Sequence, residues 1–340
     1  MKRGILPVLL LLSSLFSSAQ EPEKLLGVRL YTENDFLSPL APNKDDNYTG
    51  GLKVEIVTNL AGKFFQNKIL NPMRWVPVQQ SFAFSVTIFT PTDLRSSDIL
   101  VNERPYASYR SWNIGAGFMK ENNRINYELA IGSMGTPLGG KVQRKIHRDG
   151  WFGSTRPVPQ GWDYQIANGG SLAINVKVQF EHKLFHCAGK TNNFKWLSAS
   201  WIHETNVGQF MINYSQGVRL FLFNVNHEIP FDEDTPSIVQ LDGGKTKKKN
   251  FSFFCFLTPR LKAMFHNSTL TGQLLSRESV HVLPPTDVNK GLLEFDAGAQ
   301  LQVYCLRLGY FLYGRSREYK SEEKSFHHWG GLYLGVVAKW

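Results

Sequence analysis

Three short polar side chains flank a turn-rich loop near the start of the chain. Asn34 and Asp35 end a segment of alternating polarity, residues 26–33, and Thr49 leads into a second one, residues 52–56. Both have the period of a β-strand, so the loop is predicted to connect a hairpin and to bring the three side chains to one rim. A carboxamide, a carboxylate and a hydroxyl can bind a hard cation or orient water. The same residue types also cap ordinary turns.

A second polar group lies in the longest connection, residues 133–170. Within it, residues 138–149 contain no proline and are predicted to form a helix. Gln143 and His147 are four positions apart, so they share one face of that helix. A neutral imidazole can accept a proton from water near neutral pH. A single loop histidine is, however, also commonly a surface residue.

The rest of the chain repeats the strand period. It contains about twelve alternating segments of roughly 9 to 14 residues, the length that crosses a bilayer at a tilt. An even number of such strands predicts an all-β fold, a closed antiparallel transmembrane barrel with a short helix in one outer loop. A soluble two-sheet sandwich is the alternative. Aromatic residues at predicted strand ends favour the barrel because they are typical of an interfacial girdle; these are Tyr31, Tyr48, Tyr106, Tyr109 and Trp201.

The N-terminus predicts export. Residues 1–19 combine two basic residues, a short apolar run and small residues before Gln20, which is typical of a signal peptide. Residues 20–340 are then one barrel domain. If the barrel starts in the periplasm, the loops 34–49, 90–106 and 133–169 all lie outside. The polar hairpin and the predicted helix would then share the extracellular rim.

The composition narrows the classes of molecule that this protein could bind. The formal net charge of +10 favours an anionic surface such as a phosphorylated glycolipid, although many exported proteins are mildly basic without a specific partner. No nucleic-acid-binding motif occurs. The three cysteines are odd in number and lack metal-binding spacing, so no disulfide framework is expected.

Several short motifs in residues 30–170 together resemble one family, the outer-membrane lipid A 3′-O-deacylases of LpxR type. They occur in the family's order and comprise Glu33-Asn34-Asp35-Phe36, Asp46-Asn47-Tyr48-Thr49-Gly50-Gly51, Thr90-Pro91, Glu103-Arg104-Pro105-Tyr106-Ala107, the Gln143-to-His147 spacing and Pro159-Gln160-Gly161-Trp162-Asp163-Tyr164-Gln165. The resemblance implies a twelve-stranded, monomeric barrel in the bacterial outer membrane. Its implied activity is the Ca²⁺-dependent removal of the 3′-linked acyloxyacyl chain of lipid A in lipopolysaccharide, at the extracellular face.

The resemblance also implies site residues. The family's catalytic positions match Asn34, Asp35, Thr49, Gln143 and His147, and Asp35 is the expected metal ligand. The family's basic substrate-contacting residues do not align cleanly. Arg95 and Arg104, with Tyr106, are taken as the substrate-binding candidates.

Ester hydrolysis needs an activated nucleophile and stabilisation of an oxyanion. His147 can activate water, and Ca²⁺ near Asp35 can polarise the ester carbonyl. Thr49 either orients that water or is itself the nucleophile. The chain lacks a Gly-x-Ser-x-Gly motif, which argues against an α/β-hydrolase. The alternatives to a lipid A deacylase are an outer-membrane phospholipase and a non-enzymatic porin or adhesin barrel.

Overall fold

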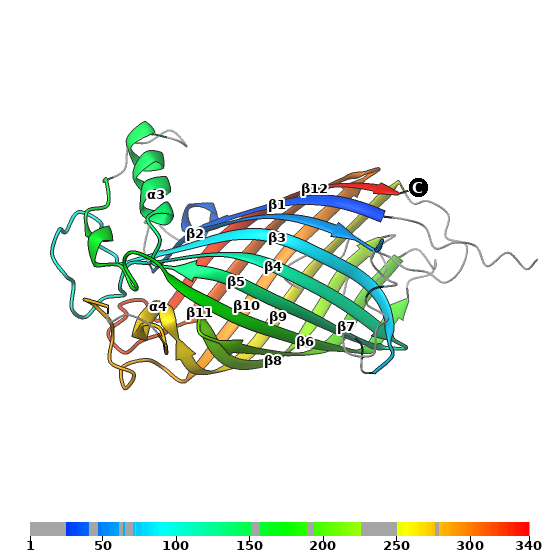
Figure 1. The fold of residues 1–340 in the computed structure, drawn as a ribbon. Coiled ribbons are helices and arrows are strands. Elements are labelled where there is room, and N and C mark those ends of the chain that lie inside the picture. The colour runs from blue at the N-terminus through cyan, green and yellow to red at the C-terminus, as the bar shows by residue number, and fades with distance from the viewer. Residues whose placement is uncertain are drawn as a thin grey trace, which may run out of the picture.

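The computed structural model is a closed antiparallel barrel of twelve strands, which confirms the predicted fold class (Figure 1). Each strand pairs with its neighbours in sequence, and β1 closes the barrel by pairing with β12. The structure describes residues 25–40, 47–60, 64, 71, 73–150, 157–188, 194–225, 250–275 and 279–339. The predicted signal peptide lies outside the described residues.

The twelve strands fall where alternating segments were predicted, but some extend further; β2, predicted over 52–56, begins at Asn47 and ends at Thr58. They are β1 (Leu25–Asn34), β2 (Asn47–Thr58), β3 (Val76–Thr90), β4 (Ala107–Lys120), β5 (Asn123–Met134), β6 (Ser171–Ala188), β7 (Phe194–Gly208), β8 (Met211–Val225), β9 (Phe251–Asn267), β10 (Gly291–Val303), β11 (Leu306–Ser316) and β12 (Phe326–Lys339).

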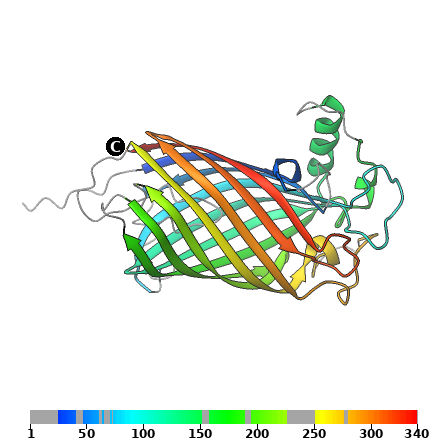
Figure 2. The ribbon, with the colours of Figure 1, turned by 180° about the vertical axis from the view of Figure 1, so that it is seen from behind.

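Four short helices lie in connections at one end of the barrel, which we call the loop end (Figure 1). They are η1 (Asp35–Leu37), α3 (Leu138–Asp149), η2 (Gly161–Tyr164) and α4 (Ser268–Thr271). Helix α3 has the bounds predicted from the sequence. Figure 2 shows from behind that β9–β12, coloured yellow to red, run the length of the barrel and that α3, in green, projects outward at the loop end. No described helix is long and apolar enough to cross a membrane.

The alternation along each strand divides the side chains between two faces. In β1, Val28 is 51% exposed whereas Arg29 is fully buried. The exposed face is aliphatic and continues onto the neighbouring strand β12, where Leu332, Leu334 and Val336 are 44–51% exposed. A continuous apolar outer wall is the surface expected of a barrel in contact with lipid.

Side chains occupy much of the barrel interior, and a cavity of about 180 Å³ remains between inward-facing residues such as Glu33 and Lys53. Charged side chains pair across the interior, including Arg29 with Glu55 at 3.4 Å and Arg219 with Glu181 at 2.9 Å. Beside them lies a cluster of buried aromatic residues, Tyr31, Phe221, Phe254, Phe256, Phe311 and Tyr333. Buried charges are tolerated when they are paired. A lumen occupied in this way differs from the water-filled channel of a porin.

The predicted aromatic girdle is wrong for four of its five residues, including Tyr106, which is 6% exposed and packs against Trp162. Tyr31, Tyr48 and Tyr109 are each 6–8% exposed and point into the barrel. Tyr48 packs there against Trp329, with the ring centroids 4.7 Å apart. Only Trp201, 45% exposed, lies on the outer wall as predicted. A strand period distinguishes two faces but does not say which one faces lipid when both carry aromatic residues.

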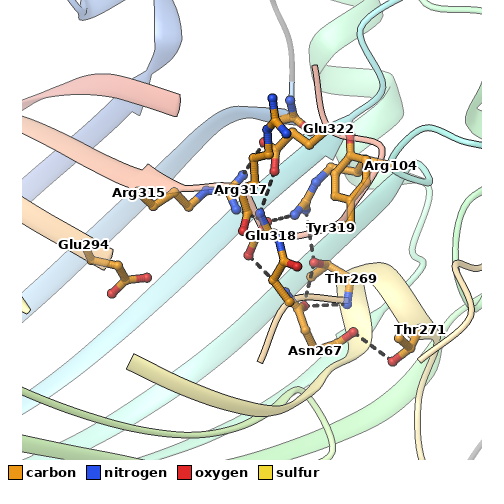
Figure 3. Close-up of polar contacts among 12 residues, drawn as sticks. Arg104, Asn267, Thr269, Thr271, Glu294, Arg315, Arg317, Glu318, Tyr319 and Glu322 are labelled. Atoms are coloured by element: carbon orange, nitrogen blue, oxygen red, sulfur yellow. Dashed lines mark hydrogen bonds and ion pairs between the residues drawn. The ribbon is translucent and has the colours of Figure 1, made fainter. Parts of the chain in front are cut away.

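A buried ionic network closes the loop end (Figure 3). The carboxylate of Glu318, after β11, accepts from Arg104 and Arg315, and from Asn267 Nδ2 at 3.1 Å. Arg104 also donates to Thr269 Oγ1 of α4 at 3.1 Å. These contacts join the β3–β4, β9–β10 and β11–β12 connections. The next residue, Tyr319, donates to Asn47 Oδ1 at 3.0 Å and so anchors the start of β2.

We expect Leu332→Arg to destabilise the barrel by about 2–4 kcal/mol, because it places a charge on the outer wall near the middle of β12. The matched control is Ala338→Arg, on the same face near the strand end, which should cost about 0–1 kcal/mol. Urea titration of protein inserted in lipid vesicles, followed by gel migration of the folded band, measures both. Equal costs at the two positions would contradict a lipid-facing wall.

Candidate active site

Asn34 and Asp35 form the junction between β1 and η1. Asn34 Nδ2 donates to the carbonyl of Thr49 at 2.6 Å, which ties the end of β1 to the start of β2. The backbone N–H of Phe36 donates to Asn34 Oδ1 at 2.8 Å and to Asp35 Oδ1 at 2.7 Å. These two side-chain oxygens therefore converge on one point. Asp35 is only 2% exposed.

Helix η1 lies on the outer wall, over β12. Gly330 of β12 faces outward with Leu332, and its missing side chain leaves room for the backbone of Leu37. Tyr310, on the same face of β11, donates its hydroxyl to the carbonyl of Leu37 at 2.8 Å. Asp35 is consequently held against the outside of the barrel, away from the lumen.

A β-bulge sets the direction of the Thr49 side chain. Tyr48 pairs with Phe89 and Gly50 pairs with Ile88, so Thr49 is the extra residue of β2. A bulge of this kind re-aims a side chain. Thr49 Oγ1 lies 2.6 Å from Thr90 Oγ1, and both residues are buried. One hydroxyl donates to the other, so the second keeps its own proton for another acceptor.

Helix α3 carries Gln143 and His147 on its buried face, as predicted from their spacing. The first turn of the helix packs on the outer wall, since a side chain at Gly139 would meet Ser108 of β4 and Ile88 of β3. Gln143 Oε1 accepts from Trp162 Nε1 of η2 at 2.9 Å. The carboxamide orientation is fixed in this way, and the buried Gln143 Nε2 has no hydrogen-bond partner in the described part of the chain.

The protonation of His147 follows from its contact with Pro157. Its Nδ1 lies 2.7 Å from the carbonyl oxygen of Pro157. A carbonyl can only accept, so Nδ1 carries the proton. In a neutral ring the lone pair is then on Nε2, which is the tautomer a general base requires.

One row of paired residues relates the position of Asn34 and Thr49 to that of helix α3. The register aligns Gly330, Asn34, Gly50, Ile88 and Ser108 across five adjacent strands on the outer face. Helix η1 covers Gly330, and the start of α3 covers Ile88 and Ser108. Asn34 and Ile88 are two strand spacings apart, about 10 Å. Asn34, Asp35, Thr49 and Thr90 therefore lie on one stretch of wall, and the first turn of α3 packs beside it; these four residues and the α3 residues Gln143 and His147 are here called the outer-wall site.

Of the three predicted substrate-binding residues, Arg104 and Tyr106 line one small pocket in the loop end, and Arg95 is not part of its lining. Arg104 is fully buried in the network around Glu318, with its guanidinium 4.7 Å from the ring centroid of Phe89. Arg95 is exposed in the β3–β4 connection. Tyr106 packs against Trp162, with ring centroids 5.0 Å apart, and burial raises its pKa to about 12. Its phenol therefore stays protonated at physiological pH.

Two residues of the outer-wall region received no role from the sequence. Thr90 and Trp162 each occur in a recognised motif, but nothing local indicated that Thr90 would contact Thr49 or that Trp162 would orient Gln143. The only available signal was membership of the motifs Thr90-Pro91 and Gly161-Trp162. Their partners are 41 and 19 residues away in the chain.

Comparison with known proteins identifies relatives of this chain. A family model described as "Outer membrane protein LpxR" matches residues 5–337. The solved structure of LpxR from Salmonella typhimurium superposes with a TM-score of 0.70 at 17% identity, covering 91% of this chain and 99% of that one. The translocator domain of the autotransporter NalP from Neisseria meningitidis gives a TM-score of 0.34 at 7% identity, covering 97% and 92%. No curated protein sequence gives a significant match.

We expect Gly140→Ala to loosen α3, although alanine favours a helix by about 1 kcal/mol. A Cβ at this position would lie 2.8 Å from Trp162 Cγ, and relieving that overlap should cost about 1–3 kcal/mol. Hydrogen exchange of the α3 amides measures the change. The control Lys145→Ala, at a side chain that is 70% exposed, should not speed exchange. Slower exchange in Gly140→Ala would contradict the packing of α3 on Trp162.

Proposed function

Because this chain belongs to the LpxR family of outer membrane proteins, we propose that it is a lipid A 3′-O-deacylase, with the loop end facing the outside of the cell. The observation that carries the proposal is the position of the outer-wall site. Asn34 shares its strand face with Val28 and Leu30, which are 51% and 40% exposed. A lipid in the surrounding leaflet can reach such a site sideways, without entering the barrel.

The occupied interior supports an enzyme over a porin. The pairs Arg29–Glu55 and Arg219–Glu181 and the aromatic cluster occupy the lumen. The polar groups suited to chemistry lie on the opposite face of the same strands. A solute channel would need its polar groups along an open lumen.

His147 is the general base in this proposal. Its Nδ1–H donates to the Pro157 carbonyl, and in this tautomer Nε2 is the nitrogen that can take a proton from water. Gln143 is one helical turn away on the same face, and its Nε2–H₂ group is buried and without a described partner. This amide can donate to the attacking water or to the ester oxygen that becomes negative.

Thr49 and Thr90 act as a hydroxyl pair. Because the two oxygens are 2.6 Å apart, each limits the rotation of the other. The pair can hold a water molecule or the reacting ester in a fixed orientation. We favour attack by water, with Thr49 as an orienting group. Direct attack by Thr49 would form an acyl-enzyme intermediate and remains the second version of the mechanism.

The junction of β1 and η1 is suited to calcium. Calcium takes six to eight oxygen ligands, including carboxylates, carboxamides, backbone carbonyls and water. Asp35 and Asn34 supply a carboxylate and a carboxamide oxygen at this junction, and each side chain already accepts from the Phe36 N–H through Oδ1. Among the described residues no group of three acidic, histidine or cysteine side chains can hold a metal, so carbonyls and water would complete the shell. When bound, calcium would polarise the ester carbonyl.

We expect His147→Ala to lower the deacylation rate by about 10²–10⁴, because removing a general base has effects of this size. Release of the 3′-linked acyl group from lipid A, followed by mass spectrometry, measures the rate. The control is His182→Ala, since His182 contacts Asn123 at the opposite end of the barrel and should keep full activity. A correctly inserted His147→Ala protein with normal turnover would refute the role of the base.

We expect a calcium chelator to abolish deacylation and added Ca²⁺ to restore it better than Mg²⁺, which requires a tighter octahedral shell. Asp35→Asn should raise the Ca²⁺ concentration needed for half-maximal rate. Asp287→Asn is the control, because Asp287 is 46% exposed and pairs with Lys320 of the β11–β12 connection. Full activity in excess chelator would exclude a metal requirement.

A further inference from the structure

A groove of about 490 Å³ lies on the outer wall beside α3, separate from the outer-wall site. It is formed where the loop-end ends of β4, β5 and β6 meet the start of α3. Its lining includes Arg110, Thr136, Leu138, Lys141 and Leu172. The mechanism proposed above uses none of these residues.

The groove and the base lie on different sides of α3. At 100° per residue, Lys141 is about 160° from Gln143 and about 120° from His147 around the helix axis. Gln143 and His147 are buried, whereas Lys141 is exposed. A molecule that extends around α3 can therefore occupy both places at once.

The groove is electropositive. Arg110 lies on the outer face of β4, the face that also carries Trp112, and its side chain is exposed. Lys141 faces the groove from the first turn of α3. None of the described lining residues is acidic, and no ion pair in the described part of the chain uses either cation. Two unpaired cations at the membrane rim attract an anionic lipid group.

Hydrogen-bond donors accompany the two cations. Thr136 lines the groove and is 6% exposed, yet its hydroxyl has no partner among the described residues. The carbonyl of Thr136 is occupied, since it accepts from Ser108 Oγ at 3.1 Å. Pro137 caps α3 without a side-chain hydrogen bond. The first amides of this twelve-residue helix therefore add donors and a positive dipole end.

The apolar part of the lining indicates that the anion belongs to a lipid. Leu172 of β6 is 59% exposed and faces the same side as Ile174, which is 41% exposed. A free phosphate would gain nothing from these side chains. A phosphorylated glycolipid places its phosphate beside acyl chains, so it matches both the cations and the apolar wall.

We propose that this groove binds a phosphate group of the substrate glycolipid, held by Arg110 and Lys141 and by donors at Thr136 and the start of α3. The assignment to the substrate rests on the proposed function. The phosphate then anchors the glycolipid on one flank of α3 while the ester reaches His147 on the other. The groove selects for phosphorylated lipid and takes no part in bond cleavage.

Binding in a background that cannot turn over tests this inference. Full-length His147→Ala protein in a phosphate-free maltoside detergent is titrated with bisphosphorylated lipid A and, separately, with enzymatically dephosphorylated lipid A. Arg110→Gln and Lys141→Gln should each weaken binding of the phosphorylated lipid about tenfold, the size of one lost charge-assisted contact. Binding of the dephosphorylated lipid should not change.

Lys145→Gln is the matched control, because Lys145 lies one turn further along α3 and pairs with Asp149. It should bind both lipids like the parent. Unchanged binding in Arg110→Gln and Lys141→Gln, or equal losses for both lipids, would overturn the inference. Displacement of the lipid by inorganic phosphate at equal concentration would also overturn it, since the groove would then be a free-phosphate site.

The outcome is separable from that of the proposed function. Phosphate-dependent binding together with an inactive wild-type protein would support the groove and defeat the deacylase. If the wild-type protein is active but binds phosphorylated and dephosphorylated lipid A equally well, the deacylase is supported and the groove inference fails. Gel migration of the folded band confirms that each variant has inserted.

Discussion

The structure depends on the hydrogen-bonded closure between the first and last strands. A lipid environment offers no partner for backbone N–H and C=O groups, so the wall must satisfy all of them itself. Here β1 pairs with β12 along its whole length, from Leu25–Lys339 to Asn34–Gly330. This last pair places Asn34 beside the bare surface of Gly330. The seam that closes the barrel is therefore also the surface on which η1 lies.

Closure also makes the two faces of each strand chemically opposite. Charges such as Arg29 and Glu55 can exist in a membrane protein because they pair inside the lumen. Aliphatic residues occupy the other face. Near the loop end this separation changes, since η1 lies on the outer wall and buries a polar group there, the carboxylate of Asp35.

The loop end gains rigidity from a few long-range contacts. Glu318 joins three connections, and its neighbour Tyr319 holds Asn47, two residues before Thr49. A buried charge network of this kind contributes little net stability on average, but removing one partner is costly. Its main effect here is geometric. The strand start that carries Thr49 is fixed by a residue of the β11–β12 connection, far away in the sequence.

The sequence by itself determined what depends on local periodicity. A period of two gave twelve strands at their observed places in the chain, and the absence of proline with helical spacing gave α3 and the shared face of Gln143 and His147. These features arise within a few residues, so they can be read from a short window.

Only the tertiary structure decided which face was which and which residues meet. It turned Tyr31 and Tyr48 inward, aimed Thr49 at Thr90 through a bulge, and buried Arg104 against Glu318, 214 residues away. It also placed Arg110 and Lys141 around one groove. These outcomes depend on strand register and on the packing of loops on the wall, and both are set by pairings between distant parts of the chain.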